Sequence, residues 1–324
     1  MPDSSVLVPR ATLNSASASA APAPLVTIVA LCHNHAPFLR EALDSILAQT
    51  YPHLEVWLVD DASTDGSPAI LQEYAAQNPA WHLLLLPENV GNCRAFNQAF
   101  RQSRGEFVID FATDDVLLPA RVAQQVQAFQ SAPTEVGMVY SDAELITEDG
   151  KLIGYHHQQL DATNRRPTPA SGWVFAEVLR RYFISTPTMM MRRACLEALG
   201  GYDETLTYED FDFWVRASRD WQFLYLDAVT TRKRKHPRSM SAKAYRRHDP
   251  FLASTIRVCD KALDLCRTSA EREALAVRLR WELRQALRHR HAAQGRELYA
   301  LLGLSGHRRP FDRLLGLLAR LPLG

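Results

Sequence analysis

Apolar positions along the first half of the chain follow two alternating patterns. Continuous runs of β-prone residues, such as Leu25 to Cys32, predict strands that are buried on both faces of a sheet. Between these runs, apolar residues recur at spacings of three and four, which predicts amphipathic helices. The predicted strands are 25–32, 54–59, 81–86, 106–111 and 136–140, and the predicted helices between them are 37–47, 67–76 and 92–103. Strands that alternate with helices predict βαβ units, a mostly parallel sheet and the α/β fold class.

The second half of the chain has a less regular pattern. Residues 143–172 are polar and predict an irregular, mobile loop. Glu209 and Asp210 precede apolar residues at helical spacing, which predicts a helix with acids in its first turn. Residues 250–302 are helical in pattern and rich in arginine, and predict a helical hairpin. Residues 311–321 predict a last, amphipathic helix.

The amino-terminal segment and the cysteines bear on the cellular compartment. Residues 1–24 are rich in Ala, Ser and Pro and lack the basic start and apolar stretch of a secretory signal, so they predict a disordered tail. The run from Leu25 to Cys32 is too short to span a bilayer, and no transmembrane helix is predicted. The five cysteines are scattered without a CxxC pair, which favours free buried thiols in the reducing cytoplasm.

Two acidic clusters directly follow predicted strands. Asp60 and Asp61 follow the second strand, and Asp114 and Asp115 follow the strand at 106–111. The carboxyl ends of parallel strands meet at one edge of a sheet, where ligands bind, so we expect both clusters to line one crevice. Carboxylates are ligands that Mg²⁺ and Mn²⁺ prefer, and such a cation can neutralise a diphosphate leaving group. A pair of aspartates at a strand end can equally cap the next turn, and this alternative stays open here.

Several short motifs stand in a characteristic order along residues 25–240. They are Val26-Thr-Ile-Val-Ala-Leu-Cys-His-Asn34, Val59-Asp-Asp-Ala-Ser-Thr-Asp-Gly66, Asn89-Val-Gly91, Asp114-Asp115, and Gly200-Gly-Tyr-Asp-Glu204 ahead of Glu209-Asp210. In this order and at these spacings they resemble family 2 glycosyltransferases. The resemblance implies a GT-A fold, which is Rossmann-like with a mostly parallel sheet flanked by helices. We therefore expect a GT-A domain at 25–240 and a basic, helical C-terminal extension at 241–324.

The resemblance also implies which residues contact the nucleotide-sugar donor. Asp61 resembles the aspartate that reads the nucleobase. Leu31, His33 and Asn34, at the end of the first strand, are expected to line the nucleoside site. Asp114 is expected near the ribose or the metal.

A divalent metal, Mn²⁺ or Mg²⁺, and a general base are implied by the same resemblance. Asp115 resembles the metal ligand, and His236 resembles a histidine that lies near the metal or the diphosphate. Asp210 resembles the general base. Many members have D-x-D-D at the metal motif, whereas this chain has Ala112-Thr-Asp-Asp115. The missing first aspartate predicts a weaker or more substrate-dependent metal site.

The function that the resemblance implies is inverting sugar transfer from a nucleotide-diphosphate donor, commonly UDP-linked. The acceptor is expected to be a hydroxyl of a glycan or lipid-linked molecule in surface polysaccharide synthesis. A catalytically weak or inactive sugar-nucleotide-binding protein of the same fold is the alternative. A nucleotidyltransferase is disfavoured, because the segment after the first strand has no glycine or lysine to cradle a triphosphate.

Charge divides the chain into an acidic and a basic part, although the net charge is +1. Residues 1–231 carry 15 Lys and Arg against 28 Asp and Glu, and residues 232–324 carry 22 against 8, so the net charges are −13 and +14. The basic part is expected to bind the diphosphate or an anionic acceptor, to contact the inner face of the membrane peripherally, or to pair with the acidic part. No nucleic-acid-binding motif accompanies it, so no nucleic acid partner is predicted.

Overall fold

The computed structural model describes residues 23–157, 169–240, 244–246 and 249–320. The strands are β1 (Val26–Cys32), β2 (Leu54–Asp60), β3 (His82–Leu85), β4 (Phe107–Ala112), β5 (Val116–Leu117), β6 (Val136–Ile146), β7 (Leu152–Tyr155), β8 (Met190–Arg192) and β9 (Gln222–Arg234). The α-helices are α1 (Ala36–Leu47), α2 (Ser67–Gln77), α3 (Asn92–Gln102), α4 (Arg121–Gln130), α5 (Phe175–Arg180), α6 (Arg193–Ala198), α7 (Asp210–Ala217), α8 (Leu252–Leu265), α9 (Ser269–Arg288), α10 (Ala292–Leu304) and α11 (Asp312–Leu318), and Thr186–Thr188 form a 3-10 helix.

The strands form one sheet in the order β3-β2-β1-β4-β8-β6-β9-β5, and β7 pairs with β6 at its side. β1 to β4 pair in parallel, as do β6 and β9, whereas β5, β7 and β8 run antiparallel to their neighbours. The register places Cys32 opposite Asp60 and Leu31 opposite Ala112. The segments that follow β1, β2 and β4 therefore begin side by side.

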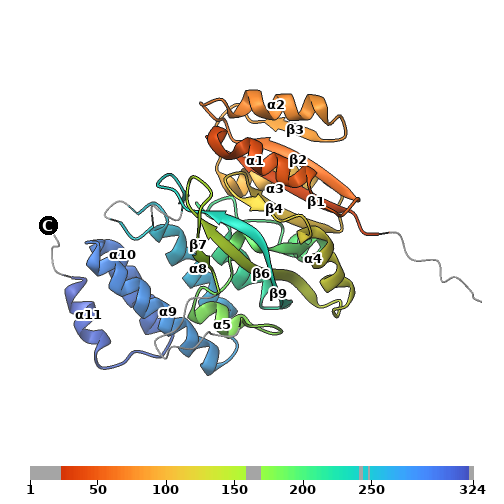
Figure 1. The fold of residues 1–324 in the computed structure, drawn as a ribbon. Helices are drawn as coiled ribbons and strands as arrows, with labels where there is room; N and C mark the ends of the chain where they lie inside the picture. The colour runs from red at the N-terminus through yellow and green to blue at the C-terminus, as the bar shows by residue number, and fades with distance from the viewer. Residues whose placement is uncertain (1–22, 158–168, 241–243, 247–248, 321–324) are drawn as a thin grey trace, which may run out of the picture.

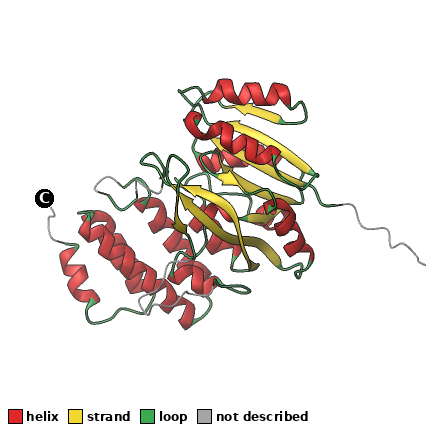
Figure 2. Ribbon diagram, viewed as in Figure 1, coloured by secondary structure: helices red, strands yellow, loops and turns green. Residues whose placement is uncertain are grey.

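Helices cover both faces of the sheet (Figures 1 and 2). Successive side chains of a strand point to opposite faces, so Ile28 of β1 lies in one apolar core with Leu39 of α1. Val29 of β1 lies in the other core, with Phe96 of α3. This double burial explains the continuous apolar run at 25–32, and the predicted α/β fold with a mostly parallel sheet is confirmed.

Two predictions for the second half of the chain are wrong. Residues 143–172 were expected to form an irregular loop, but β6 extends through Ile146 and β7 pairs with it. Most of β6 pairs with β9, and a partner so distant in sequence leaves no mark on the local pattern. The segment 250–302, which was expected to form a two-helix hairpin, consists of three helices. The pattern is interrupted at Arg290, whose φ of 65° is left-handed, so α9 ends before this residue and α10 begins after it.

The C-terminal helices share a core with the sheet. Val258 of α8 and Leu279 of α9 are buried in the same apolar cluster as Val29 of β1 and Phe211 of α7. Residues 1–22 of the predicted tail and 158–168 of the predicted loop lie outside the described residues. Within the described part of the chain, none of the helices combines the length and apolar character needed to cross a membrane.

Candidate active site

Asp61 directly follows β2, at the edge of the sheet where β1 and β2 end. Its two oxygens accept hydrogen bonds from the backbone N–H groups of Val90, at 2.7 Å, and Gly91, at 3.0 Å. Gly91 has φ 85° and ψ 157°, a conformation that side chains rarely permit. Asp61 thus holds the segment between β3 and α3 against the strand edge.

The predicted nucleoside-binding residues after β1 lie beside Asp61. Nδ1 of His33 is 2.8 Å from the Asp61 carbonyl oxygen. Asn34 has φ 59°, and its side-chain oxygen accepts a hydrogen bond from the Thr64 N–H at 2.8 Å. Leu31 differs, because its side chain is nearly buried and its carbonyl oxygen accepts hydrogen bonds from Thr113. The structure therefore brings His33, Asn34 and Asp61 together and leaves Leu31 mostly in the core.

A second group, the histidine–aspartate cluster, comprises Asp114, Asp115 and His236. Nε2 of His236 lies 3.0 Å from Oδ2 of Asp114. Oδ1 of Asp115 accepts a hydrogen bond from the backbone N–H of Arg234 at 2.7 Å. The antiparallel pairing of β5 with β9 produces both contacts, since it aligns Val116 with Arg232. Asp114, rather than Asp115, is thus the carboxylate in contact with His236.

Their surroundings shift the pKa values of Asp114 and Asp115 in opposite directions. Burial favours protonated Asp114, but the hydrogen bond from His236 and the charge of His35 outweigh it and lower the pKa of Asp114. Burial and the charge of Asp114 raise the pKa of Asp115 to about 8. His35, whose Nδ1 is 3.0 Å from Oγ1 of Thr113, was not singled out from the sequence.

The side chains of this cluster fit a divalent cation whose remaining coordination positions are filled by the substrate. Among the described residues, no group of three or more His, Cys, Asp and Glu could by itself hold a metal ion. Asp114 and His236, 3.0 Å apart, would hold such a cation together, and Asp114 is held in its charged form. Mg²⁺ commonly takes only one or two carboxylates and completes its shell with water and substrate phosphates.

A third group, the carboxylate cluster, comprises Asp110, Glu209 and Asp210. Asp210 begins α7, and its oxygens accept hydrogen bonds from Oγ1 of Thr186 at 2.9 Å and from the N–H of Phe211 at 2.6 Å. Glu209 accepts a hydrogen bond from the Asn92 side chain at 2.6 Å, and Asp110 of β4 accepts one from Tyr202 at 3.1 Å. Asp110 and Glu209 were not identified as site residues from the sequence.

Burial raises the pKa of each acid in the carboxylate cluster. The pKa of Asp110 rises to about 7, with the charge of Asp210 adding to burial. The pKa of Glu209 rises to about 8, with Asp110 and Asp210 adding. Burial also raises the pKa of Asp210, although the hydrogen bonds from Thr186 and Phe211 act to lower it. Asp210 is therefore a better proton acceptor near neutral pH than an exposed aspartate.

Two connections join the three groups. Gly91, which is bonded to Asp61, is followed by Asn92, which is bonded to Glu209. The charge of Lys233 on β9 opposes the rise in pKa of both Asp115 and Asp210, so its side chain lies within electrostatic reach of both clusters. Asp61 is thus connected to Glu209, the neighbour of Asp210, and Lys233 is within electrostatic reach of both Asp115 and Asp210.

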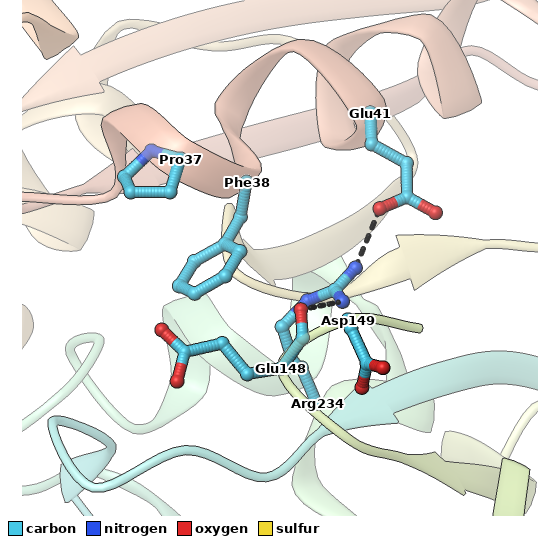
Figure 3. A pocket seen from close by; sticks show the side chains of 6 residues that line it. All are labelled: Pro37, Phe38, Glu41, Glu148, Asp149 and Arg234. Atoms are coloured by element: carbon cyan, nitrogen blue, oxygen red, sulfur yellow. Dashed lines mark hydrogen bonds and ion pairs between the residues drawn. The ribbon is translucent and has the colours of Figure 1, made fainter. Parts of the chain in front are cut away.

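A cavity of about 490 Å³ adjoins the histidine–aspartate cluster (Figure 3). It is lined by Pro37, Phe38, Glu41, Glu148, Asp149 and Arg234. Arg234 is engaged there by Glu41 at 2.6 Å and by the carbonyl oxygen of Glu148 at 2.8 Å. Three carboxylates on the wall disfavour an anionic ligand. The cavity is therefore a poor site for an anion.

Solved structures with the same fold define the class of this protein. TarS 1–349 from S. aureus, in complex with UDP-GlcNAc, is 17% identical with a TM-score of 0.65, over 91% of this chain and 89% of that one. The mannosyltransferase PcManGT from Pyrobaculum calidifontis, in complex with GDP-Man and Mn²⁺, is 22% identical with a TM-score of 0.58, over 91% and 84%. The predicted GT-A fold with C-terminal helices is confirmed.

Sequence comparison then identifies the family. The profile of glycosyl transferase family 2 matches residues 27–199, more than half of the chain. The chain therefore belongs to glycosyl transferase family 2, and the prediction that it is a glycosyltransferase of this family is confirmed. Asp210 and His236 lie beyond the matched residues, so their roles stay predictions.

Curated relatives share part of their length with this chain. An uncharacterized glycosyltransferase from Rickettsia felis is 26% identical over 223 residues, which are 68% of this chain and 36% of that protein. The O-antigen biosynthesis protein RfbC of Myxococcus xanthus is 33% identical over 185 residues, 56% of this chain and 13% of RfbC. The chain thus spans about a third of the first relative's length and less of the second.

The carboxylate cluster predicts a pH-dependent stability. Because the pKa values of Asp110 and Glu209 are raised by folding, the folded chain binds more protons than the unfolded chain between about pH 4 and about pH 8. The free energy of unfolding should therefore fall as the pH rises from about 6 to about 8.5. Glu209→Gln should reduce this slope by up to about 1.4 kcal/mol per pH unit. Thermal unfolding at several pH values, without metal or nucleotide, measures how the free energy of unfolding changes with pH.

The matched control is Glu73→Gln on α2. The ion pair with Arg40 lowers the pKa of Glu73, which keeps this carboxylate charged throughout the range, so the slope should not change. A slope in Glu209→Gln equal to that of the wild type would contradict the raised pKa.

Proposed function

We propose that this chain transfers a sugar from a nucleotide-diphosphate donor to an acceptor hydroxyl, with inversion at the anomeric carbon. The observation that carries the proposal is the arrangement around Lys233. Asp115, the neighbour of the Asp114–His236 pair, and the Asp210 carboxylate are both within electrostatic reach of this one cation. Such an arrangement provides a cation site for a leaving diphosphate and a base for the incoming hydroxyl.

In the proposed donor site, the strand-edge residues bind the nucleotide. His33, Asn34 and Asp61 offer polar groups to the nucleoside at the carboxyl ends of β1 and β2. Asp114 and His236, with Asp115 beside them, would hold the divalent cation. That cation, Mn²⁺ or Mg²⁺, would neutralise the negative charge of the departing diphosphate.

In the proposed reaction, Asp210 removes the proton of the acceptor hydroxyl. The acceptor oxygen forms its bond to the anomeric carbon while the bond from that carbon to the diphosphate oxygen breaks, and the proton ends on the Asp210 carboxylate. Thr186 and the Phe211 N–H fix the orientation of this carboxylate. Its raised pKa brings the carboxylate nearer to the working pH, as general base catalysis requires.

The identity of the substrates rests on the similar proteins. The TarS structure contains UDP-GlcNAc, which supports a UDP-sugar donor. RfbC is an O-antigen biosynthesis protein, which supports a glycan or lipid-linked acceptor in polysaccharide synthesis. A catalytically weak sugar-nucleotide-binding protein is the alternative, because Ala112 stands where many members carry an aspartate. Donor hydrolysis in the presence of Mn²⁺ separates the two.

A panel of nucleotide sugars should identify the donor. Ligand binding to the folded state raises stability by about 2.7 kcal/mol when the donor is at roughly 100 times its Kd. We expect one UDP-sugar to raise the Tm in the presence of Mn²⁺. The same sugar should raise the Tm much less when a chelator replaces Mn²⁺. Asp114→Asn should remove the difference between metal and chelator. If no nucleotide sugar shifts the Tm of the wild-type protein, the proposed function is wrong.

Substitution of the proposed base should separate binding from transfer. Asp210→Asn keeps the shape and the hydrogen bond to the Phe211 N–H but cannot accept a proton. We expect the donor-induced rise in Tm to persist while the transfer rate falls by about 10²- to 10⁴-fold. Asp212→Asn, in the same helix but paired with Arg216 and Lys261, is the control for nonspecific damage. Near-normal turnover by Asp210→Asn would exclude the base assignment.

We further propose that α11 contacts an anionic membrane surface. Its exposed apolar side chains are Phe311, Leu314, Leu317 and Leu318, with Leu304 exposed at the end of α10. Exposed Arg313 and Arg320 flank them. Apolar groups that enter the headgroup region, together with arginines that attract acidic lipids, are typical of peripheral membrane helices.

Vesicle co-sedimentation should detect this contact. Wild-type protein is expected to sediment with phosphatidylcholine–phosphatidylglycerol vesicles at low salt, and much less with phosphatidylcholine alone. Leu314→Glu with Leu317→Glu should abolish sedimentation by placing charge in the apolar face. Leu47→Glu, at an exposed leucine of α1, should leave it unchanged. Failure of the wild-type protein to bind acidic vesicles at low salt would remove the proposal.

A further inference from the structure

Tyr182 is an exposed aromatic side chain next to the carboxylate cluster. It follows α5 and is 42% exposed. The centroid of its ring lies 5.2 Å from that of Phe211 and 5.9 Å from that of Trp214, in edge-to-face arrangements. Phe211 directly follows Asp210 and donates its N–H to the Asp210 carboxylate. Arg278, which lies over the Tyr182 ring, is also within electrostatic reach of the Asp210 carboxylate, so the ring is near the proposed base.

One face of the Tyr182 ring is covered by a cation from α9, a helix that packs against α5 (Figure 1). Cζ of Arg278 lies 3.9 Å from the centroid of Tyr182 and 5.1 Å from that of Phe211. Arg278 is only 4% exposed. A desolvated guanidinium is attracted by the electrons of the ring face, which holds the ring in place. Arg278 thus covers one face of the ring and leaves the exposed part of Tyr182 away from that face.

Beneath Tyr182, charged groups retain unused hydrogen-bonding capacity. Arg278 pairs with Glu282 at 3.5 Å, and Glu282 is completely buried. Tyr245 donates a hydrogen bond to Glu282 at 3.3 Å. Nε and Nη2 of Arg278 and Oε2 of Glu282 are buried and have no hydrogen-bond partner among the described residues. Buried polar groups without partners are costly and rare, so we expect a buried water behind the ring to supply the missing bonds.

Resting on the proposed function, we propose that Tyr182, supported by Arg278 and Glu282, forms the subsite that binds the acceptor sugar beside Asp210. A pyranose ring has an apolar C–H face, which packs on an aromatic ring, and hydroxyl groups at its rim, which exchange hydrogen bonds with polar groups. Because Arg278 and Glu282 neutralise each other, the subsite suits a neutral sugar. A ring that is already fixed loses little freedom when it binds.

This assignment gives α9 a part in substrate recognition. The family profile matches residues 27–199, so Tyr182 lies inside the matched part and Arg278 and Glu282 lie outside it. The ring is thus provided by the part of the chain that matches the family, and its support by the C-terminal helices. The acceptor preference of this chain is therefore set jointly by the two parts.

Saturation-transfer NMR with the full chain tests the subsite. The probes are the methyl glycosides of glucose, galactose, mannose and N-acetylglucosamine, with UDP or GDP and the diamagnetic ion Mg²⁺ present. We expect the wild-type protein to transfer saturation to the ring-face protons of at least one glycoside. Tyr182→Ala should weaken this binding by about 3- to 10-fold, the range of a single aromatic contact, and Tyr182→Phe should retain it. Arg278→Met should also weaken it, because the ring loses its support.

The controls distinguish the subsite from the fold and from the donor site. Leu47→Ala removes an exposed apolar side chain from α1 and should leave glycoside binding unchanged. Nucleotide binding, measured by calorimetry, should be the same in every variant. Absence of glycoside binding by the wild type, or equal binding by Tyr182→Ala, overturns the subsite. Absence of UDP and GDP binding by the wild type would instead overturn the proposed donor chemistry.

Discussion

The pairing of β9 with β5 and β6 is the constraint on which the candidate site depends. Through it, the Arg234 N–H reaches Asp115, and His236 reaches Asp114 from a position 122 residues away. The same strand carries Lys233, whose charge acts on both Asp115 and Asp210. Without these backbone hydrogen bonds, the acids at the end of β4 would face neither the histidine nor a cation.

Burial of charge is the second feature that shapes this site. Asp110 comes from β4, and the consecutive residues Glu209 and Asp210 come from the start of α7. Each carboxylate accepts a hydrogen bond from a neighbour that holds it in place. Because several carboxylates share a region that is partly shielded from water, the ionised form of each is disfavoured. Protonation, a nearby lysine and a bound divalent cation all relieve this repulsion. The raised pKa values of these acids are therefore a consequence of packing several carboxylates into one buried region.

The C-terminal helices contribute to the site as well as to the fold. α8 and α9 are buried in the same core as α7, which carries Asp210, so the orientation of that helix depends on them. Arg278 of α9 lies under Tyr182 and Phe211, the residue after the proposed base. The region with a net charge of +14 therefore cannot be understood only as a charged tail on an acidic domain.

The sequence alone was sufficient for features that depend on neighbours along the chain. The apolar runs predicted β1, β2 and β4, and parallel pairing implies that residues after these strands meet, so Asp61 and Asp114 could be placed at one edge. Motif order predicted Asp210 and His236. The path of β6 and β9, the roles of Asp110 and Glu209, and the support of Tyr182 by Arg278 were decided only by the tertiary structure. Burial, pKa and ring contacts depend on groups from distant segments, and no local pattern of apolar and polar residues specifies which of those segments pack together.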